Sequence, residues 1–402
     1  MRRLGVVFFA LVLLAGAGAG PAVPTAAASA SENPVFLYSV NDGVANSVSA
    51  YTVLRNGGLR QITGSPFLTG GAGDAALPEG FAFISARTAD IARAGNRLYV
   101  ANMGSSPATI SAFTINPRTG SLRSLPGSPY ALGFTGEFSL VVAPDGSRVY
   151  AAQATAHNVE VLPIKRDGSL DARHRADTET SIITIGMAIS PDGRWLAIAG
   201  VTDMAAETMD IKSQVFAISS RTGSLTEAAG SPLSMWATAV AFGPSHHGST
   251  TLFAATANGE VFNYAVTPRS ITKISGVTIN SKVSGLQSIA VTPDGSTVYT
   301  AEPWSQSLYS FRVDRHGILS QTAGPVLVGP ARVVEGLALA PDGKRLYFTM
   351  VGEDTDAGSP GSIGAVRLGS HGSMTVTVPG MPVATGLSGY LRSIVLVEGE
   401  SR

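Results

Sequence analysis

The sequence predicts an all-β fold, a seven-bladed β-propeller built from four-stranded antiparallel blades. The chain has 46 Gly and 23 Pro among its 402 residues, a composition that favours many tight turns over long helices. A unit of about 50 residues recurs along the chain, and repeats of this length are typical of propellers. A carboxy-terminal segment also matches one strand of the unit, so the last strand is expected to complete the first blade.

The first repeated marker is a Pro-Asp-Gly turn followed by a short apolar run. Proline fixes φ, aspartate caps its own turn and glycine takes the left-handed position, so the tripeptide predicts a hairpin between the first and second strands. Its role is therefore in folding and not in chemistry. Copies begin with "APDGSRVYAAQ" at Ala143, "SPDGRWLAIAG" at Ser190, "TPDGSTVYTAE" at Thr292 and "APDGKRLYFTM" at Ala340, and Gly95 and Gly248 fill the gaps.

Two further markers recur along the chain. A glycine after a small polar residue predicts the turn between the third and fourth strands; copies are "NGGL" at Asn56, "TGSL" at Thr119 and Thr222, "DGSL" at Asp167, "HGIL" at His316 and "HGSM" at His371. The fifth unit departs there, with "TPRSI" from Thr267. Proline cannot donate to a strand ladder, so "GSP" motifs predict an outer-strand position; they begin at Gly64, Gly127 and Gly230, with a variant "AGPV" at Ala323.

The first unit begins with "PVFLYSV" at Pro34 and offers only three strands. The segment "LRSIVLVEG" from Leu391 matches the first strand of the other units and has no unit of its own. A carboxy-terminal strand in the first blade would close the ring and remove its exposed edges.

Composition excludes several classes of function. The chain has 28 basic and 28 acidic residues and no basic cluster in the sequence that would release counterions from nucleic acid, so no nucleic-acid partner is expected. Cysteine is absent, which excludes disulfides and thiol catalysis. No cofactor is expected, and the protein is expected to be a monomer.

Residues 1–30 predict a secretory signal peptide, which leaves residues 31–402 as a single propeller domain. "MRR" supplies a charged start, "LGVVFFALVLLAGAGAG" an apolar region and "AAASA" a small-residue cleavage site. The alternative is an uncleaved membrane anchor, but the apolar span is short for that. No later segment is expected to cross a membrane, so the mature chain is expected to be secreted and either released or loosely wall-associated.

The markers "SPDGRWLAIAG", "GNRLYVAN", "RTGSL" and "GSPF" resemble the lactonase-type seven-bladed propellers, which include 6-phosphogluconolactonases, and the related YVTN-repeat surface proteins. The resemblance spans nearly all of residues 33–399 and implies the fold more strongly than a function. It also implies channel-facing His residues five positions before the turn proline. The equivalent positions here are all small: Thr88, Ser139, Gly186, Ala239, Ser288, Gly336 and Ser393.

The residues one position earlier are the candidate site. In ring order they are Arg87, Phe138, Ile185, Thr238, Gln287, Glu335 and Arg392. Four polar members, Gln287, Glu335, Arg392 and Arg87, become contiguous when the ring closes, and we name them the crescent. Polar groups facing an apolar wall are how small-ligand sites are often built. The alternative is a structural brace in which Glu335 pairs with Arg392 or Arg87.

Other candidates have structural alternatives. Glu353, Asp354 and Asp356 form an acidic loop that is either a calcium site or a solvated loop whose spacing matches no calcium motif. Among the tryptophans, Trp304 is the expected ligand-stacking residue, and Trp195 and Trp236 are expected to serve packing. The six histidines are expected to be solvated turn residues, because none has the spacing of a metal site.

Two functions therefore remain. The first is a secreted propeller that binds a small molecule, a glycan or a cell-surface protein at the channel mouth and catalyses no reaction. The second is a lactonase-type hydrolase of sugar lactones with a rebuilt site, in which Glu335 activates water and Arg87 and Arg392 hold an anionic group.

Overall fold

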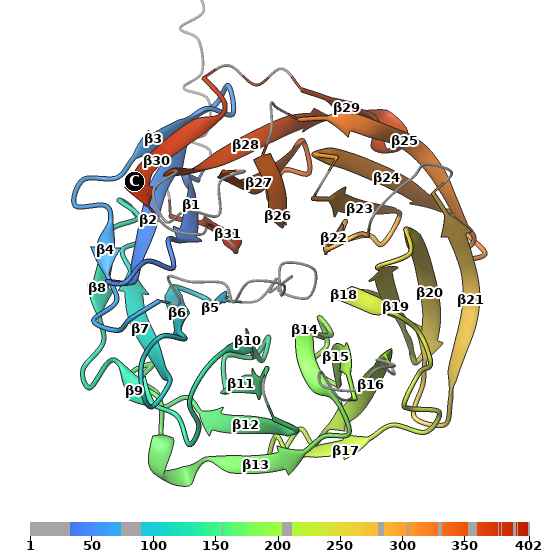
Figure 1. The fold of residues 1–402 in the computed structure, drawn as a ribbon, viewed down its shortest axis with the longest axis horizontal. Coiled ribbons are helices and arrows are strands. Elements are labelled where there is room, and N and C mark those ends of the chain that lie inside the picture. Colours follow the sequence, from blue (N-terminus) through green and yellow to red (C-terminus); the bar gives the residue numbers. More distant parts are fainter. Residues whose placement is uncertain are drawn as a thin grey trace, which may run out of the picture.

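A computed structural model of the chain describes residues 33–73, 90–154, 156–202, 211–279, 285–303, 305–328, 332–352, 360–376, 378, 380–388, 391 and 393–400. These residues form seven antiparallel sheets arranged as a ring (Figure 1). No helix in this part of the chain is long and apolar enough to cross a membrane. The predicted seven-bladed β-propeller is confirmed.

We number the blades from the one that contains β1. The inner strands of blades 1 to 7 are β31 (Ile394–Glu398), β5 (Ile91–Ala94), β10 (Phe138–Val142), β14 (Ile183–Ile189), β18 (Ala237–His246), β22 (Ser288–Val291) and β26 (Arg332–Leu339). The second strands are β1 (Val35–Val40), β6 (Arg97–Asn102), β11 (Arg148–Gln153), β15 (Trp195–Val201), β19 (Ser249–Thr256), β23 (Thr297–Glu302) and β27 (Arg345–Gly352).

The third strands are β2 (Ser47–Val53), β7 (Thr109–Ile115), β12 (Asn158–Pro163), β16 (Ile211–Ile218), β20 (Glu260–Val266), β24 (Ser307–Val313) and β28 (Pro360–Leu368). The outer strands are β3 (Leu59–Gln61), β4 (Phe67–Leu68), β8 (Leu122–Ser124), β9 (Tyr130–Ala131), β13 (Ala176–Glu179), β17 (Leu225–Glu227), β21 (Ile271–Thr278), β25 (Leu319–Leu327), β29 (Met374–Thr375) and β30 (Val383–Ser388). Two short 3₁₀ turns, η1 (Ala172–His174) and η2 (Ser370–Gly372), complete the described elements.

The ring closes through the carboxy-terminal strand, as the sequence predicts. Strand β31 pairs antiparallel with β1, with Leu37 opposite Leu396, and so becomes the inner strand of blade 1. It also contacts β26 of blade 7 and β5 of blade 2. The inner strands thus surround the axis without an open edge (Figure 1), which removes the edges that a linear array would expose.

The Pro-Asp-Gly turns lie between first and second strands, and their glycines have positive φ (68° at Gly146 and 70° at Gly193). The aspartate caps its turn: Ser147 N–H donates to Asp145 Oδ1 at 2.9 Å. Proline and glycine set the backbone and aspartate satisfies it, so the turn is fixed by local geometry.

The "GSP" motifs lie where the outer strand is interrupted, as in blade 2 between β8 and β9. The serine hydroxyl there replaces a strand partner, because Ala112 N–H donates to Ser128 Oγ at 2.9 Å. Equivalent bonds run from Ala50 N–H to Ser65 Oγ and from Val215 N–H to Ser231 Oγ. The predicted outer-strand position is confirmed.

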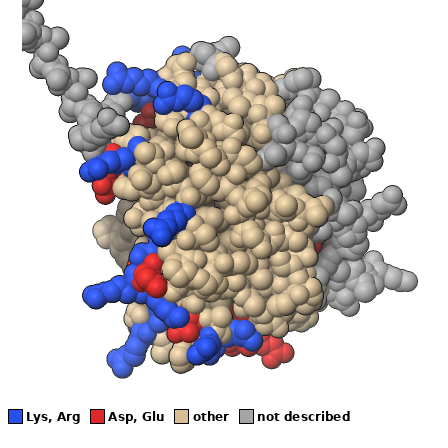
Figure 2. Space-filling model, turned by 90° about the vertical axis from the view of Figure 1, so that its left-hand side faces the viewer, with Lys and Arg blue, Asp and Glu red and all other residues tan. Residues whose placement is uncertain are grey.

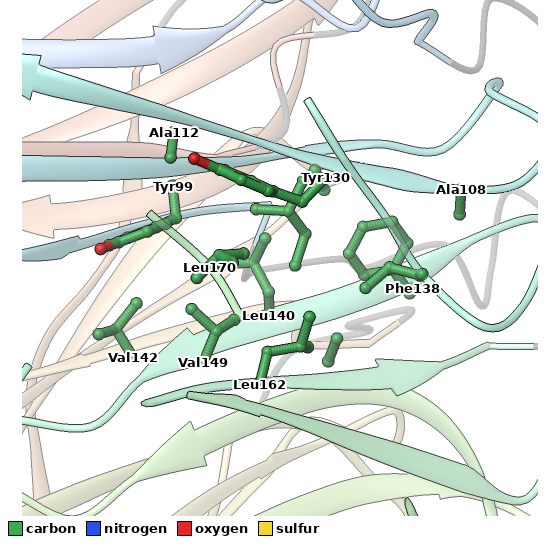
Figure 3. Packing of buried hydrophobic residues seen from close by; sticks show 14 of the residues in the cluster. Tyr99, Ala108, Ala112, Tyr130, Phe138, Leu140, Val142, Val149, Leu162 and Leu170 are labelled. Carbon is green, nitrogen blue, oxygen red and sulfur yellow. The ribbon is translucent and has the colours of Figure 1, made fainter. Parts of the chain in front are cut away.

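Seven clusters of buried apolar side chains lie in the described structure, and each spans the junction between two neighbouring blades. At the junction of blades 2 and 3, Tyr99 and Tyr130 pack with Leu140 and Val149 (Figure 3). The rings of Phe134 and Phe138 meet edge to face there, with centroids 5.5 Å apart. Because each blade shares a core with both neighbours, burial depends on the whole ring.

The turn markers of one blade contact those of the next, in an arrangement that we name the latch. At the junction of blades 2 and 3, Arg97 Nη2 donates to the Arg166 carbonyl at 2.8 Å, and Tyr99 Oη donates to the Gly168 carbonyl at 2.9 Å. The same pairs recur as Arg148 and Tyr150 between blades 3 and 4, and as Arg345 and Tyr347 between blades 7 and 1.

Candidate functional site

The candidate site lies where the inner strands begin, at the end of the ring opposite the hairpin turns. The seven blades have one residue each at the repeat position of the crescent. In three blades this residue occupies a β-bulge of the inner strand: Ile185, Thr238 and Glu335. In blade 7 the register shifts between Val334 and Leu337, so Glu335 lies on the bulge. Bulges change the direction of side chains and are frequent beside binding sites. The sequence did not predict that bulges would recur at the same position of three blades.

Thr238 shows what such a bulge residue does in blade 5. Its hydroxyl donates to the carbonyl of Leu286, which precedes the inner strand of blade 6, and also lies 3.2 Å from the Ala255 carbonyl. The bulge therefore connects two blades at their entrance. Glu335 occupies the corresponding place in blade 7, and its Oε2 atom is buried.

Gln287 is the most informative described residue of the crescent. It lies directly before β22, where its N–H donates to the Ala301 carbonyl at 3.1 Å. Only 7% of the residue is exposed, and its side-chain amide makes no hydrogen bond within the described structure. The Oγ atom of the adjacent Ser288, 1% exposed, likewise has no partner there. Buried polar groups are normally hydrogen-bonded, so this pair has unused capacity.

The rest of the predicted site falls largely outside the described residues. Arg87, Arg392 and Trp304 lie there, and so does the candidate calcium loop with Glu353, Asp354 and Asp356. No cluster of metal-ligating side chains occurs in the part of the chain that is described. Of the crescent, the structure thus describes two members in neighbouring blades: Gln287, directly before β22, and Glu335, the fourth residue of β26.

The positions equivalent to the family histidines are small and, where described, buried. Ser139, Ala239, Ser288 and Ser393 are each at most 2% exposed, and Gly186 and Gly336 are buried as well. Thr88 lies outside the described residues. Small buried side chains at this level place no imidazole at the entrance, and so no histidine acid or base acts from these positions.

Asp90 is a carboxylate that sequence reasoning missed. It directly precedes β5 and is 1% exposed, and its N–H donates to Ser393 Oγ at 3.0 Å. Ser39 Oγ in turn donates to the Ser393 carbonyl at 3.1 Å. The entrance of blades 1 and 2 therefore holds a buried carboxylate beside hydroxyls. Its position three residues after Arg87, just before an inner strand, was the available signal.

The histidines and tryptophans mostly follow expectation. His157, His174, His246, His247, His316 and His371 are all exposed, as predicted for turn residues. Trp195 is 3% exposed and packs between blades 4 and 5. Trp236 differs from the packing expectation, because it is 44% exposed and lies just before β18, near the Thr238 bulge.

Comparison with known proteins supports the fold. No protein-family model and no curated protein matches this chain. Among solved structures, the periplasmic gluconolactonase of Pseudomonas aeruginosa superposes with a TM-score of 0.67 at 14% identity, covering 92% of this chain and 100% of that one. A Bacteroides fragilis protein provisionally described as a 6-phosphogluconolactonase gives 0.63 at 17% identity, covering 92% and 99%.

A Lactobacillus plantarum protein gives a TM-score of 0.65 at 16% identity and covers 91% of this chain and 100% of that one. At such identities the likeness concerns the fold and not the activity. The chain therefore has the fold of the lactonase-type seven-bladed β-propellers, in agreement with the resemblance of its repeats.

Proposed function

We propose that the protein is an extracytoplasmic propeller that binds a small polar ligand at its channel mouth without catalysing a reaction. The observation that carries this proposal is Gln287, which is only 7% exposed and whose side-chain amide makes no hydrogen bond to the described residues. An amide offers two donors and an acceptor. A ligand that pairs with it uses donors and an acceptor that the described residues leave available.

Export is supported by the signal-peptide pattern of residues 1–30 and by the periplasmic location in the description of the Pseudomonas aeruginosa protein. The absence of histidine at the family positions argues against the usual lactone chemistry. The ligand class is a sugar acid, sugar lactone or short glycan, because such molecules present many hydroxyls to an amide.

The test is a thermal-shift and calorimetric screen of these compounds on the mature protein, since a ligand that binds the native state raises its melting temperature. For a ligand so found, Gln287→Met should weaken binding by about three- to tenfold, the value of one ordinary hydrogen bond. The same change should leave the melting temperature of the free protein equal or higher. Gln321→Met, on an exposed outer strand, is the matched control. Unchanged affinity of Gln287→Met would refute the proposal.

The alternative is a hydrolase with a rebuilt site, and Glu335 on its bulge is the observation that favours it. In that case Glu335 activates water while Arg87 and Arg392 hold an anionic group. Glu335→Gln should then abolish lactone turnover while binding survives. Turnover of sugar lactones by the wild-type protein, lost in this variant, would replace the binding proposal with the hydrolase.

A further inference from the structure

The ring gathers basic residues that the sequence disperses. The first-to-second and third-to-fourth turns lie at the same end of every blade, because successive strands run in opposite directions. On blades 1 to 3, six exposed arginines lie in these turns or within two residues of them: Arg55, Arg60, Arg93, Arg118, Arg123 and Arg166. We name this group the arginine face.

Figure 2 shows the charged side chains gathered along one edge of this side of the ring, with Lys and Arg predominating. The broad surface formed by the blade edges is almost uncharged. Acidic residues occur at the same end. Asp145 and Asp167 cap their own turns, bonded to Ser147 and Ser169, and keep their charge. Glu398 and Glu400 add two exposed carboxylates at the end of blade 1.

The latch holds part of this face in place. The carbonyls of Arg55 and Arg166 accept hydrogen bonds from Arg345 and Arg97 of the preceding blades, at 2.7 and 2.8 Å. Their own guanidinium groups remain exposed and, like those of Arg60 and Arg123, make no hydrogen bond or ion pair within the described structure. The backbone is thus fixed while the charges stay available to a partner.

The acidic residues described at the opposite end of the ring are mostly buried. Asp42, Asp90 and Glu302, at the ends of strands there, are each at most 2% exposed. The arginine face, by contrast, is exposed. Exposed charge of one sign on one face orients a protein in the field of a charged surface.

We propose that the arginine face docks the protein on an anionic phospholipid surface, with the channel mouth turned away from it. A plane of headgroup phosphates meets all the turn arginines at once. A flexible soluble polyanion would have to be ordered to do the same, at an entropic cost. Each basic residue that lies within a Debye length of an anionic membrane adds its own contribution to the attraction. Several arginines together can therefore hold the protein at the surface without apolar side chains entering the lipid.

The test is sedimentation of the mature protein with phosphatidylcholine vesicles that either contain or lack phosphatidylglycerol. We expect binding only to the anionic vesicles, weakened by salt. The triple variant Arg55→Gln, Arg60→Gln, Arg123→Gln should bind about 100-fold more weakly, since each basic residue contributes about a fivefold factor. The matched triple Lys variant keeps the charge and should bind within about threefold of wild type.

Melting temperatures near that of wild type confirm that the variants are folded. Equal binding to both kinds of vesicle, or no loss in the Gln variant, would overturn the proposal. Binding to soluble polyphosphate but not to anionic vesicles would overturn it too, and would identify a polymer as the partner. The result is independent of the channel-mouth ligand, because none of these arginines belongs to the crescent.

Discussion

The junction between blades 3 and 4 and the junction between blades 4 and 5 are held in different ways. In the first, Arg148 Nη2 and Tyr150 Oη donate to the carbonyls of Arg221 and Gly223, at 3.0 and 3.1 Å. In the second, Trp195 and Ala197 stand at the equivalent positions of blade 4, and blade 5 has "TPRSI" instead of the glycine turn.

The second junction relies on other contacts. The Trp195 ring packs with Tyr264 and Val266, and its Nε1 has no partner in the described structure. Asp192 of blade 4 accepts a hydrogen bond of 2.6 Å from Ser245 of blade 5. The arginine, the tyrosine and the glycine turn, which form the two sides of one contact at a latched junction, are therefore all absent from this one.

The largest expected effect is the alkaline sensitivity of the latched junctions. Burial raises the pKa of Tyr99, Tyr150 and Tyr347 to about 12, although a nearby arginine opposes it in each case. Unfolded tyrosines ionise near pH 10, so the unfolded state loses its protons first. The free energy of unfolding should fall between pH 10 and 12, by roughly 2 to 3 kcal/mol per tyrosine.

Urea unfolding measured from pH 9 to 12 checks this expectation. A variant with phenylalanine at all three positions should have a flatter profile in that window. An equally steep profile in the variant would show that the latch tyrosines are not the cause.

The next effect concerns the glycine on the accepting side of the latch. Gly168 has a φ of 91°, and a Cβ there would lie 2.0 Å from Arg97 Nε. Gly168→Ala should therefore cost about 3 kcal/mol, from backbone strain and the displaced arginine. Gly248→Ala is the control, because its φ of 82° brings the strain but its Cβ meets nothing within 4 Å. The control should cost about 1 kcal/mol, and equal losses in urea unfolding would argue against the latch.

Removing one latch hydroxyl should have a smaller effect. Tyr150→Phe leaves the buried Gly223 carbonyl without its donor and should cost about 1 to 2 kcal/mol. Tyr264→Phe, at the junction of blades 4 and 5, should be nearly neutral, because that hydroxyl makes no hydrogen bond to the described residues. Chemical denaturation of both variants compares the two junctions directly, and a loss at Tyr264 as large as that at Tyr150 would contradict the distinction.

The smallest expected effect concerns Asp192, which bonds blade 4 to blade 5 at the junction that has no latch. Burial raises the pKa of Asp192, but hydrogen bonds from Ser190, Ser245 and Arg194 outweigh it and hold the pKa well below its ordinary value. A lowered pKa stabilises the native state above the unfolded value of about 4, and this contribution is lost as the pH falls further. Asp192→Asn should cost about 1 kcal/mol at neutral pH and flatten the stability profile below pH 4. An unaltered acid profile would exclude Asp192 as the bridge.

Most of the fold could be predicted from the sequence, because its determinants are local and repeated. Gly146 and Gly193 fix hairpins through their own φ angles, and the strand from Leu391 had no other blade to join. The site was predictable only in part. The repeat placed Gln287 and Glu335 at the same position of their blades. The bulge at Glu335, however, depends on the pairing register between β26 and β27, and no local sequence pattern encodes that register.

The sequence by itself determined the number of blades, the turn at each hairpin and the strand that closes the ring, since backbone preferences act within a few residues. Only the tertiary structure decided which distant groups meet. Asp90 and Ser393 are bonded across 303 positions of the chain, and Gln287 is buried at the entrance of its blade. The dispersed arginines share one face for the same reason, because burial, hydrogen bonding and electrostatic fields depend on distance in space and not on separation along the chain.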